Sequence, residues 1–138
     1  MLNLSNTKNT LLRNVPLFSD RPNRELDLIS SIADIVDVPA GKQLTREGDR
    51  GREFYAVVSG TAEVTRRDQQ IATLGPGDFF GEIALVSKMP RTATVTTTSP
   101  ARVLVITDQD FRRLLEIDPQ IRLRVLGSFA ERVSDLII

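Results

Sequence analysis

Residues 80–95, which read FGEIALVSKMPRTATV, contain side chains that together could hold a small anion carrying hydroxyl groups. Gly81 and Glu82 open a short apolar run that predicts one or two helical turns. The first amides of such a helix have no acceptor within the helix, and they favour an anion at the helix N-terminus. Arg91 follows a turn marked by Pro90, and its guanidinium can offer a planar fork of donors to a phosphate group.

Glu82 cannot bind the phosphate itself, because like charges repel. A carboxylate beside an anion site is useful if the ligand also has hydroxyls to donate, as a ribose has, so the segment indicates a nucleotide pocket. Two plainer interpretations stay open. Glu82 can be an acidic residue favoured in the first turn of a helix, and Arg91 can be a solvated loop arginine.

The pattern FGE(I/L)AL, a short variable stretch, then PR(T/A/S)AT(V/I), resembles the phosphate-binding cassette of cyclic nucleotide-binding domains. These are the sensor domains of catabolite-activator-like regulators, of the regulatory subunit of cyclic-AMP-dependent kinase and of cyclic-nucleotide-gated channels. The resemblance covers roughly residues 10–135. Its flanking parts recur in the family in the same order; they are residues 15–18, 48–49, 57–60 and 74–80.

The resemblance implies a ligand, 3′,5′-cyclic AMP, and no other cofactor or metal. Arg91 would bind its phosphate and Glu82 its ribose 2′-hydroxyl. Thr92 leaves cyclic GMP as the alternative ligand, because in the family a hydroxyl at this position can bond a guanine. The expected ligand-binding residues are Gly81, Glu82, Ile83, Ala84, Arg91, Thr92 and Ala93.

Composition limits the remaining functions. The chain has 138 residues, of which 41% are hydrophobic, which suits one well-buried domain and is too short for two. We expect a flexible N-terminus over residues 1–9 and a single domain over 10–138. Eighteen basic and eighteen acidic residues cancel, so we expect no nucleic-acid binding by this chain.

The chain also lacks the usual residues of enzymes and metal sites. It contains no cysteine and no histidine, and no set of acid, base and nucleophile is visible, so we expect neither catalysis nor metal binding. It has no apolar run of the roughly 18 residues that a membrane span needs, and no signal-peptide core. We therefore expect a cytoplasmic protein without a membrane segment.

Hydrophobic periodicity predicts a mainly β fold with flanking helices. Several short strand-like runs are separated by turn residues, which is typical of a jelly-roll or barrel, here a double-stranded β-helix. The predicted strands are residues 35–38, one around Leu44, 54–58, 62–65, 71–74, 93–97 and 103–106. Helical spacing precedes the strands, interrupts them once in the cassette and follows them. We expect Ser19 or Asp20 to cap the second helix, and Asp108 to cap the first one after the strands.

The last helix, from about residue 119, has a broad apolar face. The resemblance implies that it covers the base and contacts a second copy or an effector domain, and that ligand binding moves it. No basic helix-turn-helix follows it, unlike in the transcription regulators. The chain is either free-standing or an excised regulatory domain, and the sequence does not decide between the two. The alternative function is an oligomerisation or docking module with a non-functional pocket.

Overall fold

The computed structural model describes residues 4–137 and consists of two antiparallel four-stranded sheets that face each other. The first sheet has the order β1 (Ala33–Val38), β8 (Ala101–Thr107), β3 (Glu53–Ser59) and β6 (Phe79–Phe80). The second has the order β2 (Gln43–Thr45), β7 (Thr94–Thr97), β4 (Ala62–Arg66) and β5 (Gln69–Leu74). The predicted mainly β jelly-roll is confirmed, although within residues 4–137 the two sheets are not joined into a closed barrel.

The central strands β3 and β8 are apolar on both faces because each face covers a different core. Side chains alternate along a strand, so Phe54 and Ala56 of β3 point to one side and Tyr55 and Val57 to the other. The first pair lies in a core shared with the helices, and the second pair lies in a core between the two sheets. This double burial explains why β3 reads as a continuous apolar run.

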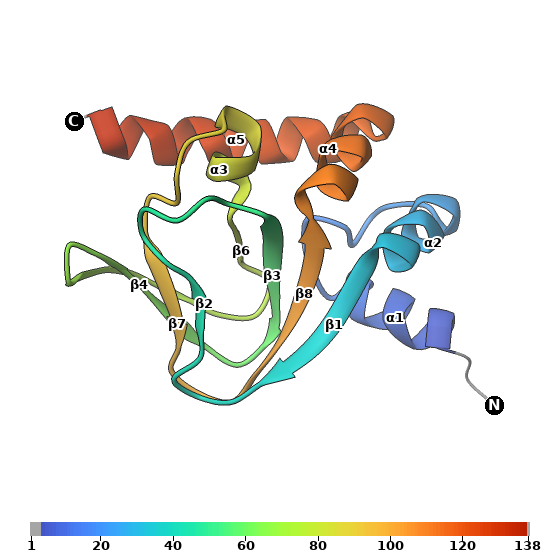
Figure 1. Cartoon of the computed structure of the whole chain (residues 1–138). Helices are drawn as coiled ribbons and strands as arrows, with labels where there is room; N and C mark the ends of the chain where they lie inside the picture. The colour runs from blue at the N-terminus through green and yellow to red at the C-terminus, as the bar shows by residue number, and fades with distance from the viewer. Residues whose placement is uncertain (1–3, 138) are drawn as a thin grey trace.

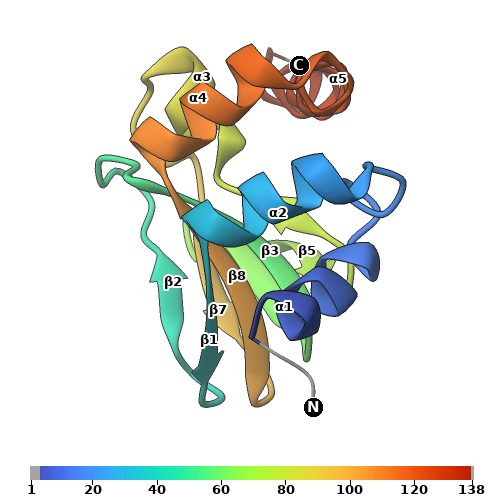
Figure 2. The same cartoon turned by 90° about the vertical axis from the view of Figure 1, so that its right-hand side faces the viewer.

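Within residues 4–137 the chain forms five helices: α1 (Leu4–Arg13), α2 (Asn23–Ile32), α3 (Glu82–Ser87), α4 (Asp108–Ile117) and α5 (Pro119–Ile137). Helices α1 and α2 lie beside β1 and β8, whereas α4 and α5 cross one end of the sandwich (Figures 1 and 2). The short helix α3 interrupts the strands between β6 and β7 and lies next to α5 (Figure 1). The predicted cassette helix is therefore present at the end that α5 covers.

A tight turn at residues 75–77 leads the chain into this segment. Gly77 has a φ of 92°, a left-handed conformation that glycine adopts without strain. Its amide donates to the carbonyl of Val57, and the Asp78 carboxylate accepts from the amide of Gly75. These bonds dock the turn on β3, which allows the following residues to pair with β3 as strand β6.

Two predicted helix caps were wrong by a few residues. Helix α2 begins at Asn23 with Pro22 as its N-cap and no side-chain cap, because the Asp20 carboxylate instead binds Arg124. Helix α4 is capped by Thr107, whose hydroxyl accepts from the amide of Asp110, so Asp108 is its first helical residue.

The N-terminal segment forms a helix. Residues 4–9, expected to be part of a flexible terminus, belong to helix α1, and the Lys8 ammonium donates to the carbonyls of Ser30 and Ala33. Residues 1–3 lie outside the described residues. In the part of the chain that the structure covers, no helix combines the length and the apolar character that crossing a bilayer requires.

Candidate functional site

A cavity of about 440 Å³ opens between the second sheet and the segment around α3. Gly81, Ala84 and Arg91 line one side of it, while aliphatic side chains of β4 and β5, Val64 and Ile71 among them, line another. Its volume lies within the range of about 300–1,000 Å³ that is typical of small-molecule sites. The cavity thus has a polar, cationic side and an apolar wall.

Arg91 is held rigidly at the polar side. Its side chain is buried, and its guanidinium donates from Nη1 to the carbonyl of Gly81 at 3.0 Å and from Nη2 to that of Glu53 at 2.6 Å. Its backbone is paired with the loop before β3, because its amide donates to Asp49 and its carbonyl accepts from Gly48. The loop at residues 48–51 therefore helps to position Arg91.

Two glycines allow the close approach of this arginine. A Cβ at Gly81 would lie 2.7 Å from Arg91 Nη1, and the φ of 95° at Gly81 disfavours any other residue there. A Cβ at Gly51 would lie 2.5 Å from the Cβ of Ala84 and 3.2 Å from the Arg91 guanidinium. Both positions must therefore lack a side chain if α3 and Arg91 are to pack as they do.

Glu82 is fully buried and bound by the last helix. Arg132 of α5 donates from Nη1 to both carboxylate oxygens, at 2.6 and 2.9 Å, and from Nη2 to the carbonyl of Phe79 at 2.6 Å. The Ser128 hydroxyl adds a longer bond of 3.4 Å to Glu82. Arg132 thus lines the cavity, whereas the carboxylate that it binds does not.

The burial of these groups shifts their protonation equilibria. Desolvation raises the pKa of Glu82 above its ordinary value of 4.5, although the charge of Arg132 acts in the opposite direction. Burial also lowers the pKa of Arg91, against the attraction of Tyr55, Glu53 and Glu82. An arginine nevertheless keeps its charge in proteins, so Arg91 remains a cation that can bind an anion.

The raised pKa of Glu82 predicts a pH-dependent stability difference between the native protein and Glu82→Gln. A folded-state pKa above the unfolded one means that the folded protein binds more protons, so this contribution is present below about pH 4.5 and is lost as the pH rises through the folded pKa. We expect the native protein to lose unfolding free energy relative to Glu82→Gln in urea titrations as the pH rises above about 4.5 and through the raised folded-state pKa. A difference that grows in favour of the native protein would mean that Arg132 outweighs burial.

The structure brings most of the predicted site residues together. Of the predicted residues, Gly81, Ala84, Arg91, Thr92 and Ala93 line the cavity, whereas Glu82 does not. Ile83 is part of α3, and its side chain lies outside the described part of the structure. Sequence reasoning missed Gly51, Arg66 and Arg132. Arg66 lines the cavity and its Nε donates to the carbonyl of Thr92 at 2.8 Å.

Comparison with known proteins finds a family model that covers both the strands and the segment around α3. Residues 35–118 match the model of the cyclic nucleotide-binding domain. The cAMP-dependent protein kinase regulatory subunit of Yarrowia lipolytica is 39% identical over 106 residues, which cover 75% of this chain and 28% of the subunit. The chain therefore spans little more than a quarter of that relative's length.

Solved structures agree with this assignment. The Thermus thermophilus catabolite activator protein superposes with a TM-score of 0.77 at 28% identity, over 88% of this chain and 59% of that one. The regulatory domain of Toxoplasma gondii PKA, crystallised with cAMP, gives a TM-score of 0.80 at 23% identity over 93% of this chain and 50% of the other, a likeness of fold. With a family model that matches more than half of its length, the chain belongs to the cyclic nucleotide-binding domain family.

Proposed function

We propose that this domain binds 3′,5′-cyclic AMP at the cavity beside α3 and acts as a regulatory sensor, not as an enzyme. The observation that carries the proposal is the buried Arg91, which lines a cavity large enough for a nucleotide and is held there by two carbonyl groups. A buried cation in a small-molecule cavity favours an anionic ligand. The phosphate would sit against Arg91 and the amides at the start of α3, near Ile83 and Ala84.

The rest of the cavity suits the remaining parts of a cyclic nucleotide. Its aliphatic wall, formed by Val64, Ile71 and Leu74 among others, offers the base an apolar surface. Ile71 is 47% exposed. Covering Ile71 by a base would remove apolar surface from water and so add to the affinity.

Calorimetric titration of the domain with cyclic AMP and cyclic GMP tests the proposal. We expect saturable binding of one ligand per chain, with higher affinity for cyclic AMP, in line with the cAMP-dependent regulatory subunits among the relatives. Thr92 lines the cavity and could bond a guanine, so tighter binding of cyclic GMP would make the domain a cyclic-GMP sensor. No binding of either nucleotide would contradict the proposal.

A docking module with an inactive pocket is the second candidate. Leu123 and Leu126 of α5 are 63% and 42% exposed, and they give this helix an apolar surface that a second copy or an effector domain could cover. Both candidate functions would use this surface of α5, but only the sensor requires a pocket that binds a nucleotide. Calorimetry separates them, because a docking module would retain the fold and show no binding heat.

A further inference from the structure

A second cavity, of about 450 Å³, opens where α3 packs against α4; Figure 2 shows the two helices side by side. Its walls come from the loop at residues 48–51, from α3 and the turn at residues 88–90 that follows it, and from the first turns of α4. Among the described residues, Ala84 alone lines both this cavity and the one proposed for the nucleotide. The proposed function gives the second cavity no role.

The wall of the second cavity is predominantly cationic. Arg50, Lys88 and Arg112 line it together with one carboxylate, that of Asp108. Three cations and one anion give the wall a net charge of +2, although the whole chain has a net charge of zero. A cleft lined mainly by one sign of charge concentrates ions of the opposite sign, so this cavity favours an anion.

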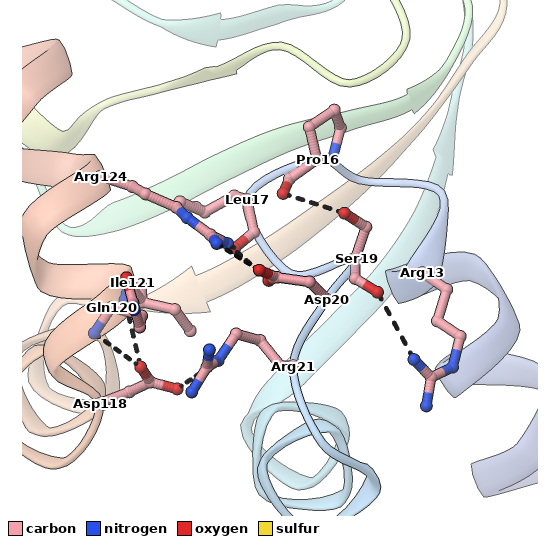
Figure 3. A network of polar contacts seen from close by, with 10 residues as sticks. All are labelled: Arg13, Pro16, Leu17, Ser19, Asp20, Arg21, Asp118, Gln120, Ile121 and Arg124. Carbon is pink, nitrogen blue, oxygen red and sulfur yellow. Dashed lines mark hydrogen bonds and ion pairs between the residues drawn. The ribbon is translucent and has the colours of Figure 1, made fainter.

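Other arginines of the domain are already paired with carboxylates. Figure 3 shows Arg21 bound to Asp118 at 2.9 Å and Arg124 bound to Asp20 at 2.6 Å. In the part of the chain that the structure describes, by contrast, none of the three cations at the second cavity forms an ion pair with a carboxylate. Their charges are therefore available to a ligand.

Arg112 is oriented by one hydrogen bond that leaves most of its donors available. Its Nε donates to the carbonyl of Leu85 in α3 at 3.4 Å, and its two Nη atoms have no acceptor among the described residues. A guanidinium with free Nη groups can offer a planar fork to phosphate oxygens. The nearby Asp108 carboxylate accepts from the amide of Gln109, at the positive end of the α4 dipole, which offsets part of its charge.

Lys88 adopts a backbone conformation that its residue type disfavours. It is the C-cap of α3, with a φ of 60° and a ψ of 21° in the left-handed region. Glycine is the most common residue where a helix ends in this conformation, because it has no Cβ to strain. Lys88→Gly would thus remove the ammonium group from the cavity without disturbing the turn.

We propose that the second cavity binds a small molecule that carries a phosphate group, held by Arg50, Lys88 and Arg112. A phosphate monoester has a charge of about −1.5 to −2 at neutral pH, which matches the wall, whereas a carboxylate has a charge of only −1. The volume lies within the range of about 300–1,000 Å³ that is typical of small-molecule sites, so the cavity has room for more than a single ion. The inference does not depend on the proposed function.

Calorimetric titration of the whole chain with pyrophosphate, inorganic phosphate and acetate tests the ligand class. We expect pyrophosphate to bind most tightly, inorganic phosphate more weakly and acetate not measurably. The affinity for pyrophosphate should fall as sodium chloride is added, because exposed charges are screened. No binding of pyrophosphate, or equal binding of pyrophosphate and acetate, would overturn the proposal.

Two variants and a matched control test the position of the site. Arg112→Gln should weaken pyrophosphate binding about fivefold, as expected for an exposed charge pair with good geometry. Lys88→Gly should weaken it similarly without lowering the thermal unfolding midpoint. Arg113→Gln is the control, because Arg113 is the next residue of α4, is exposed and does not line the cavity. Equal weakening in Arg112→Gln and Arg113→Gln would indicate general surface charge and contradict a defined site.

Pyrophosphate could also bind at Arg91, so the two cavities must be distinguished. We expect Arg91→Ala to retain pyrophosphate binding, since Arg91 does not line the second cavity. Binding that is lost in Arg91→Ala and kept in Arg112→Gln would place the probe in the first cavity and overturn the second site. A failure of cyclic AMP to bind would contradict the proposed function alone, because the pyrophosphate titrations require no nucleotide.

Discussion

Replacing Arg91 by alanine should weaken cyclic nucleotide binding at least about tenfold while the domain remains folded. Each hydrogen bond to a charged partner contributes roughly 1.5–3 kcal/mol, and 1.4 kcal/mol corresponds to a factor of ten in affinity. The fold should survive, because the core clusters do not include Arg91. One of the two carbonyls that it leaves, that of Gly81, belongs to a residue that lines the cavity, where water can replace the guanidinium. Calorimetry and thermal unfolding measure the two effects.

Arg102→Ala is the matched control for this experiment. Arg102 is an exposed arginine of β8 that pairs with Asp37 at 2.8 Å and does not line the cavity, so its removal should leave the affinity unchanged. Arg91→Lys should rescue binding only in part, since a point charge cannot reproduce a planar fork of donors. An unchanged affinity in folded Arg91→Ala would remove this residue from the site.

Local patterns predicted much of the fold. Alternating apolar residues located the strands because period-two burial is a property of neighbouring residues. Strand β6 was missed, since the two residues Phe79 and Phe80 are too few to show a period. The caps of α2 and α4 were misplaced because several hydroxyl and carboxylate side chains compete near each helix start, and distant partners decide between them. The Asp20 carboxylate binds Arg124 and does not cap α2, and Arg124 lies 104 residues away in sequence.

The candidate site was predictable where its residues are consecutive and unpredictable where they are not. Arg91 and the glycine before Glu82 lie within one segment, so their spacing alone indicated an anion pocket. Arg132 lies 50 residues after Glu82 on a helix whose polar residues resemble an ordinary solvated face. A single sequence gives no signal that this arginine, among the five of α5 and its neighbour α4, reaches into the cavity.

A ligand without the 2′-hydroxyl should bind the native domain at least about tenfold more weakly than cyclic AMP. The 2′-hydroxyl would donate to Glu82, a charged and fully buried acceptor, and a bond of this kind contributes roughly 1.5–3 kcal/mol. In Glu82→Gln the acceptor is neutral, so the penalty for 2′-deoxy-cyclic AMP should shrink. Comparing both ligands on both proteins by calorimetry isolates the interaction between the hydroxyl and residue 82.

Glu116→Gln serves as the control for charge alone, since Glu116 is an exposed carboxylate of α4 away from the cavity, and it should retain the full 2′-deoxy penalty. Arg132 makes the outcome informative in either direction. If the hydroxyl shares Glu82 with the guanidinium, the native protein must discriminate between the two ligands. If the native protein binds both ligands equally, the carboxylate serves only Arg132 and the first turn of α3. The sugar would then be recognised by residues that line the cavity, and not by Glu82.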